Sequence, residues 1–142
     1  SLPERFEMGT VNTSGIAGLN AAVKWIQSQT VPSLYLEEQK KRKALLDLLN
    51  KYDFINIIGN EPSQEYVGIV SCVIDSVSSD TAAQLFSERN ISVRTGLHCA
   101  PLAHKFLGTY PSGTIRFSVN YFTTQEDFFD LQAALDDIEE NI

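Results

Sequence analysis

The sequence predicts a small α/β domain of the α+β kind, with helices packed on a four-stranded sheet and two linker helices before it. Apolar residues recur at helical spacings through the first fifty residues. Short runs rich in Val and Ile appear from residue 54 onward and alternate with further helical patterns. Hydrophobic residues make up 43% of the 142 residues and charged residues 20%, an ordinary globular composition that suits one compact domain or part of a larger one.

Two helices are predicted in the first fifty residues, after an irregular lead over residues 1–13. Asn12 offers a capping oxygen for the first helix, and its apolar face has spacings of three and four, formed by Ile16, Leu19, Val23 and Ile26. Pro32 interrupts this segment, and Ser33 is expected to cap a second helix that runs to about Lys51. Because both helices are amphipathic and precede the sheet, we expect them to pack on something outside the small sheet domain.

Four β-prone runs are predicted to form the sheet, with helices or loops between them. The strands are expected at residues 54–58, 66–74, 91–94 and 113–119. Ser79 begins a helix after the second strand, and a loop from residue 97 enters a short helix that Gly108 ends. Thr123 is expected to begin the last helix, with Glu126 three residues later as a capping box requires.

The charge of the chain disfavours a nucleic-acid partner. The formal net charge is −7 at pH 7, whereas binding to phosphates needs clustered positive charge. The basic cluster at residues 40–43 has acidic residues within one or two helical turns, so we interpret it as a solvated helix face.

The sequence also bears on the setting in which the protein works. No apolar stretch approaches the roughly 20 residues that a membrane-spanning helix needs, and the polar start lacks a signal-like apolar segment. No membrane association is therefore expected. Two cysteines, Cys72 and Cys99, do not make a disulfide framework, so a cytoplasmic setting is the default expectation. The start lacks Met, and we expect the chain to be cut from something longer.

The stretch richest in chemistry covers residues 94–104, between a predicted strand and a short helix. It contains Arg94, His98, Cys99 and His104, and both histidines of the chain are among them. Cysteine is a nucleophile in its thiolate form, and nearby cations or a helix N-terminus lower its pKa from about 8.5. Loops on a rigid scaffold often carry catalytic residues. Cys99 is therefore a candidate nucleophile.

Other interpretations of these residues compete with this one. Cysteine is often a small buried hydrophobe, which is the favoured interpretation for Cys72 within an apolar strand, whereas composition alone leaves Cys99 open. A zinc site needs three or four ligands, and Cys72 is the only obvious further soft ligand, so no metal is expected. A Cys–His hydrolase site is disfavoured because no acid that would orient the base is identifiable. His104 falls on the short helix and is expected to be structural.

Three stretches of the chain carry a family resemblance. The first is Arg-Thr-Gly-Leu-His-Cys-Ala-Pro-Leu-Ala-His at residues 94–104, followed by Leu-Gly-Thr at residues 107–109 and Gly-Thr-Ile-Arg-Phe-Ser at residues 113–118. The second is Arg-Phe-Glu-Met-Gly-Thr-Val-Asn at residues 5–12, and the third is Asn-Tyr-Phe-Thr-Thr at residues 120–124. Together they resemble the C-terminal part of cysteine desulfurases with the class V aminotransferase fold.

This resemblance implies the C-terminal part of a fold type I enzyme that uses pyridoxal 5'-phosphate. Residues 1–32 would be the tail of the large cofactor domain and the start of the connecting helices, and residues 33–142 the small domain with the catalytic cysteine loop. The family takes sulfur from L-cysteine, leaves L-alanine and holds the sulfur as a persulfide on the cysteine that Cys99 matches. A homodimer is expected for the full-length protein, and a sulfur-acceptor protein is a further candidate partner.

The resemblance also implies roles for individual residues. Arg116 matches the arginine that clamps the substrate carboxylate, a task suited to a planar bidentate donor, and Arg94 is expected to help position the substrate or the loop. His98 is expected to assist proton transfer or thiolate formation at Cys99. Gly9 and Thr10 match the segment that reaches the cofactor phosphate of the other subunit.

Two departures from the family pattern matter. Leu97 stands where some desulfurases carry a first histidine. The lysine-bearing large domain is missing, and Lys105 does not match the Schiff-base context, so this piece alone is expected to be inactive and not to bind the cofactor firmly. The alternatives are another class V aminotransferase or a selenocysteine lyase, and a non-catalytic interaction module.

Overall fold

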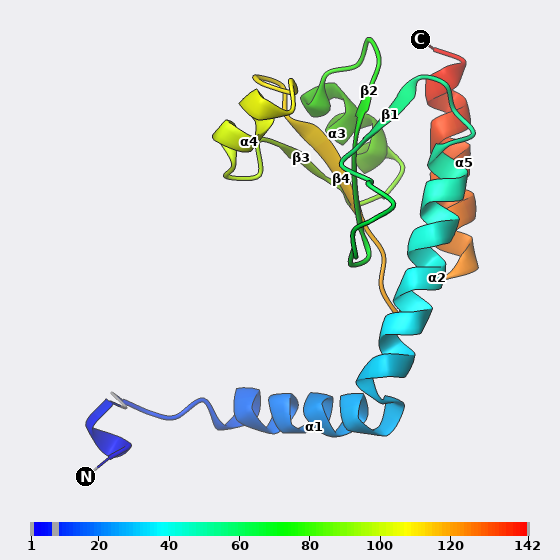
Figure 1. The fold of residues 1–142 in the computed structure, drawn as a ribbon. Helices are drawn as coiled ribbons and strands as arrows, with labels where there is room; N and C mark the ends of the chain where they lie inside the picture. The colour runs from blue at the N-terminus through cyan, green and yellow to red at the C-terminus, as the bar shows by residue number, and fades with distance from the viewer. Residues whose placement is uncertain (1, 7–8, 142) are drawn as a thin grey trace. The chain divides into compact units, whose positions relative to one another are not determined.

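The structure is a computed structural model that describes residues 2–6 and 9–141. The chain forms two compact units, Ser1–Tyr35 and Leu36–Ile142. The first unit holds the N-terminal segment with the first helix, and the second holds the sheet (Figure 1). Within the described residues, no helix is both long enough and apolar enough to cross a membrane.

The first unit contains a short 3-10 turn, η1 (Glu4–Phe6), the helix α1 (Thr13–Gln29) and the start of the next helix. The Asn12 side chain caps α1 as predicted, since its Oδ1 accepts the Gly15 N–H at 2.9 Å. None of the residues of α1 is buried. The predicted apolar face is present but exposed along its whole length, at Ile16, Leu19, Val23 and Ile26.

The helix α2 (Val31–Leu49) begins earlier than the sequence predicts. Thr30 takes a left-handed backbone with φ of 64° and separates the two helices. Its Oγ1 lies 3.4 Å from the Ser33 N–H and accepts from it, so the prediction that Ser33 caps this helix is wrong. Pro32 is tolerated in the first turn because its missing N–H is not needed there.

The second unit is built on a four-stranded antiparallel sheet of order β1-β2-β4-β3. The strands are β1 (Ile55–Ile58), β2 (Ile69–Ile74), β3 (Arg94–Gly96) and β4 (Thr114–Ser118), and the helices are α3 (Ser79–Glu88), α4 (Pro101–Phe106) and α5 (Gln125–Glu139). The order of helices and strands along the chain is the predicted one. The predicted α/β class, with helices on a four-stranded sheet, is confirmed (Figure 1).

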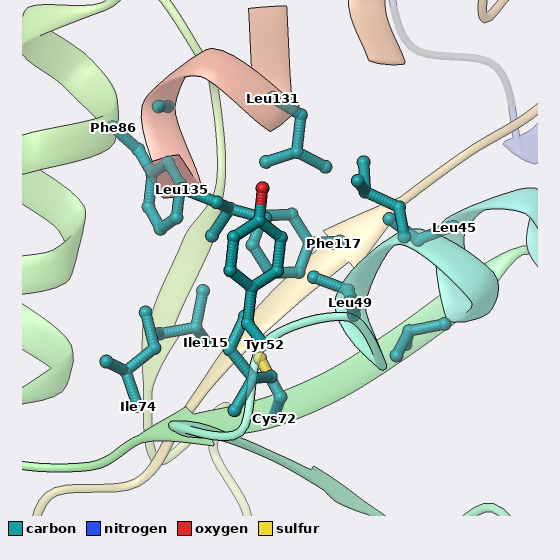
Figure 2. Packing of buried hydrophobic residues seen from close by; sticks show 14 of the residues in the cluster. Leu45, Leu49, Tyr52, Cys72, Ile74, Phe86, Ile115, Phe117, Leu131 and Leu135 are labelled. Carbon is teal, nitrogen blue, oxygen red and sulfur yellow. The ribbon is translucent and has the colours of Figure 1, made fainter. Parts of the chain in front are cut away.

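One face of the sheet forms the core with α2, α3 and α5 (Figure 2). The expectation that both N-terminal helices pack outside the sheet domain is therefore wrong for α2, which buries its last turns in this core. Alternate residues of β2 point into it, so Val70, Cys72 and Ile74 are buried. The rings of Phe86 and Phe117 meet edge to face, with centroids 5.4 Å apart. The remaining large members of the core are Leu45, Leu48, Leu49, Tyr52, Ile55, Ile115, Val119, Leu131, Leu135 and Ile138. The opposite face of the sheet, which carries Arg116, is left more open.

Several boundaries in the second unit differ from the sequence prediction, and the second strand, expected at residues 66–74, begins only at Ile69. The third strand is expected at residues 91–94 but begins at Arg94, three residues later. The Ile91 N–H donates to the Phe86 carbonyl, so Ile91 is bonded to the end of α3. The last helix is capped by Thr124 with Asp127, whose backbone and side-chain groups bond reciprocally, and not by Thr123 with Glu126.

The basic run at residues 40–43 is only partly a solvated face. Lys40 and Lys43 are exposed and pair with acidic residues of the same helix, as predicted. Arg42 is only 8% exposed, which corrects the prediction for this residue. Its Nη2 donates to Asn60 Oδ1 at 2.8 Å, and its guanidinium lies 4.5 Å from the centroid of the Tyr66 ring.

The close approach of β3 and β4 depends on Gly113. This residue has φ of 78°, and a Cβ built on it would lie 2.2 Å from the carbonyl carbon and oxygen of Gly96. Only glycine therefore lets the chain enter β4 beside the end of β3.

We predict that Gly113→Ala lowers the free energy of unfolding by about 2 kcal/mol or more, because the new Cβ adds a clash to the strained φ. Urea denaturation of both proteins measures the loss. Gly108→Ala is the matched control, since Gly108 also has a left-handed φ, of 73°, but has open space around it. This control should lose only about 1 kcal/mol. Equal losses in the two variants would contradict the clash.

Candidate active site

The candidate nucleophile Cys99 lies in a tight turn between β3 and α4. The Ala100 N–H donates to the Leu97 carbonyl at 2.8 Å and closes the turn. Its two central residues both have a left-handed backbone, with φ of 48° at His98 and 61° at Cys99. Such a conformation is strained for residues with side chains and persists only where surrounding contacts hold it. The Cys99 side chain is exposed, as a reacting thiol requires.

His98 is held against the start of β4. Its Nε2 lies 3.1 Å from Thr114 Oγ1, and its Nδ1 is buried with no hydrogen-bond partner in the described part of the chain. Burial lowers the pKa of His98, and the positive charge of Arg116 lowers it further. The imidazole is therefore neutral at pH 7 and retains a lone pair that can accept a proton.

His104 supports the same region from α4. It is 5% exposed, and its Nδ1 lies 2.7 Å from Thr109 Oγ1. The His104 and His98 rings face each other with centroids 5.9 Å apart and an angle of 39° between their planes. This placement fits the structural role predicted for His104.

Arg94 and Arg116 lie directly opposite each other on β3 and β4. Residues that pair in this way project from the same face of the sheet, and here it is the face opposite the core. Arg94 is exposed and Arg116 is half-buried, with its Nε buried and unbonded among residues 2–6 and 9–141. Like charges directly opposite each other on neighbouring strands are unfavourable, so this position suits an anion that contacts both side chains.

Thr114 is the site residue that the sequence analysis missed. It lies two residues before Arg116, and the period of two along a strand puts both side chains on one face. Its hydroxyl contacts His98, so it joins the cysteine turn to the arginine pair. The strand period alone would have placed it beside Arg116, but its contact with His98 depends on the pairing of β3 with β4.

The two cysteines have different environments. Cys72 is 0% exposed within β2, and burial raises the pKa of its thiol to about 12. The prediction that Cys72 is a buried structural residue is confirmed. Cys99 is the exposed free thiol of the pair. No group of three or more His, Cys, Asp or Glu side chains in the described residues is placed to hold a metal ion.

Gly9 and Thr10 belong to the first unit, whereas the turn and the two arginines belong to the second. Both residues are exposed, and Gly9 has φ of 86° with no atom within 4 Å of the place a Cβ would take. Their backbone is thus open to a ligand. Glu7 and Met8, which belong to the same sequence motif, lie outside the described residues.

Comparison with known proteins identifies the class to which this fold and site belong. The model of the aminotransferase class-V family matches residues 1–131, and the chain belongs to this family. The chain is 31% identical over 135 residues to a probable cysteine desulfurase of Vibrio cholerae. The aligned region covers 94% of this chain and 32% of that protein.

Solved structures agree with this assignment. The fold matches a cysteine desulfurase from Thermococcus onnurineus with a TM-score of 0.85 and 26% identity, over 99% of this chain and 34% of that one. It also matches the cystine C–S lyase C-DES, solved with its product cysteine persulfide, with a TM-score of 0.73 and 26% identity over 94% of this chain and 32% of that one. The chain thus spans about a third of the length of these relatives.

We predict that acidification from about pH 7.5 to about pH 5.5 destabilises the wild-type protein more than a His98→Gln variant. The pKa of His98 is lower in the folded protein than its ordinary value of 6.5. At pH values below 6.5, His98 is protonated more in the unfolded chain than in the folded protein. The free energy of unfolding therefore falls as the pH falls. Urea denaturation at both pH values measures the difference. The same loss in both proteins would show that His98 does not titrate as described.

Proposed function

We propose that the full-length protein is a cysteine desulfurase and that this chain supplies its persulfide-forming residue, Cys99. The observation that carries the proposal is the exposed thiol in a strained turn, which His98 and Thr114 connect to the facing arginines Arg94 and Arg116. A nucleophile beside a carboxylate-binding position fits an amino-acid substrate with a reactive side chain. The relatives named as cysteine desulfurases support the same reaction.

The substrate L-cysteine would be held by its carboxylate. Arg116 is half-buried and has a free buried Nε, so it can offer a fixed donor edge to a carboxylate. Arg94, opposite it, adds a second positive charge and helps to position the substrate or the loop. Binding of the carboxylate relieves the repulsion between the two side chains and satisfies the unbonded Nε.

Cys99 would then take the sulfur. A bond forms between the Cys99 sulfur and the substrate sulfur while the carbon–sulfur bond of the substrate breaks, and the remainder of the substrate leaves as L-alanine. The exchange balances without an oxidant, because one thiol and one cysteine give one persulfide and one alanine. His98 is neutral and directly precedes Cys99 in the sequence, so it is the residue proposed to accept the thiol proton and return a proton later.

The residues of this chain fit part of a pyridoxal 5'-phosphate site. When bound, the cofactor supplies an electron sink that the side chains lack. Gly9 and Thr10 would hold the phosphate of the cofactor in the other subunit of a dimer, because the open backbone at Gly9 and the exposed Thr10 hydroxyl offer hydrogen-bond donors. Lys105 is not assigned to the cofactor, since its Nζ lies over the Tyr110 ring, 5.0 Å from the centroid. This chain alone is therefore expected to be inactive and to hold the cofactor weakly.

The wider setting is also proposed. Residues 1–32 would belong to the tail of the large cofactor domain and residues 33–142 to the small domain, which agrees closely with the two compact units. The exposed apolar face of α1 supports packing on a large domain or on a second subunit. Free thiols at both cysteines support a reducing, cytoplasmic setting. A sulfur-acceptor protein would take the sulfur from the Cys99 persulfide.

A second candidate reaction is C–S bond cleavage without a protein persulfide. The similarity to the cystine C–S lyase C-DES favours it, because that protein was solved with cysteine persulfide as a free product. A selenocysteine lyase, which would break a carbon–selenium bond, and another class V aminotransferase, which would transfer an amino group, are the further alternatives. In each of these reactions the Cys99 thiol would be dispensable.

We predict that Cys99→Ala in the full-length protein lowers cysteine-dependent alanine release by about a hundredfold or more, because the variant lacks the exposed thiol that this chain supplies as the nucleophile. Alanine and sulfide are measured together under a reductant. Cys72→Ala is the control, and it should keep its activity while losing about 1 kcal/mol of stability. If Cys99→Ala works as well as the wild type, the lyase or aminotransferase reaction replaces the desulfurase.

We predict that Arg116→Lys raises KM for cysteine by about tenfold or more, because lysine keeps the charge but loses the bidentate donor edge. Arg94→Lys should have a smaller effect, since Arg94 is exposed. Steady-state kinetics of the full-length enzyme separate the two variants. If KM changes by less than about twofold in both variants, the arginine pair does not bind the substrate carboxylate.

A further inference from the structure

The helix α4, which follows Cys99, is attached to the domain through one residue. Of the six residues of α4, only His104 is buried. Leu102 and Phe106 on the same helix are strongly exposed, so they add little packing. His104 is bonded twice to Thr109, through its Nδ1 at 2.7 Å and through its carbonyl, which accepts the Thr109 N–H at 2.9 Å. This pair of residues fixes the end of α4.

The His104 ring reaches back to the cysteine turn. It faces the His98 ring at a centroid distance of 5.9 Å. His98 also contacts Thr114 through Nε2, while Nδ1 has no bond within the described part of the chain. The His98 side chain therefore has two supports, one from β4 and one from α4.

The turn needs such supports because it has few others. Its backbone is strained at both His98 and Cys99, and a single backbone hydrogen bond, from Ala100 to Leu97, closes it. The Cys99 side chain is exposed and is not part of the buried core. The restraint on the position of the thiol thus comes chiefly through the neighbouring His98 side chain.

We propose that His104, held by Thr109, is a positioning residue for the Cys99 thiol and acts through the His98 ring. The role of the thiol in catalysis rests on the proposed function, whereas the hold on the turn does not. Loss of His104 would leave space behind His98 and free the turn to relax from its left-handed conformation. The Arg94 and Arg116 positions, fixed by strand pairing, would remain unchanged.

Kinetics of the full-length enzyme test the positioning role. His104→Ala should lower kcat for alanine formation by about tenfold or more, because small displacements of a reacting group are costly. KM for cysteine should stay within about twofold, since the arginines are undisturbed. Thr109→Val should act in the same direction, and Thr109→Ser, which keeps the hydroxyl, should restore kcat. Leu102→Ala is the matched control on the same helix and should match the wild type.

Hydrogen exchange of the peptide covering residues 97–100, followed by mass spectrometry, gives a readout that does not depend on the reaction. His104→Ala should speed exchange there and leave peptides of β2 and β4 unchanged. The proposal is overturned if His104→Ala behaves like Leu102→Ala in both measurements. It is also overturned if exchange rises throughout the sheet and Thr109→Ser fails to restore kcat. If the wild type makes no alanine, the proposed function fails, and exchange at residues 97–100 alone decides the positioning role.

Discussion

The turn from Leu97 to Ala100 is the constraint on which the rest of the site depends, because two residues with side chains take a left-handed backbone there. Each such residue costs about 1 kcal/mol or more. Supports from β4 at Thr114 and from α4 at His104 offset this cost. The conformation of the turn therefore depends on β3, β4 and α4 together, and this dependence ties an exposed cysteine to the rigid part of the domain.

The alternation of residues along the strands separates chemistry from packing. Residues on one face of β2 and β4 build the core, while Arg94 and Arg116 project from the other face. The same rule decides what each cysteine can do. Cys72 points into the core, where burial raises its pKa to about 12 and keeps the thiol protonated at neutral pH. Cys99 lies beyond the end of a strand and is exposed, so only this thiol is open to a substrate.

The order of helices and strands could be predicted because it follows from local patterns, such as the apolar spacing in α1 and the Val-rich and Ile-rich runs of the sheet. The position of β3 could not, since Ile91 and Val93 pack on the core without a strand partner. Arg42 was misplaced because its burial depends on Asn60 and Tyr66, which are distant in sequence. Within the site, residues 94–104 could be singled out from their composition and family resemblance. Their contacts with Thr114 and Thr109 depend on the folded arrangement.

The facing arginines of β3 and β4 link folding to ligand binding. Their mutual repulsion lowers the stability of the ligand-free sheet, and an anion that bridges them removes this penalty while it binds. The same coupling energy would then contribute to the affinity for a carboxylate and to the free energy of unfolding. A sequence change that relaxed the repulsion, such as a neutral side chain at either position, would strengthen the empty domain and weaken the occupied one. An anion bound between the two arginines, as proposed, would therefore stabilise the folded domain.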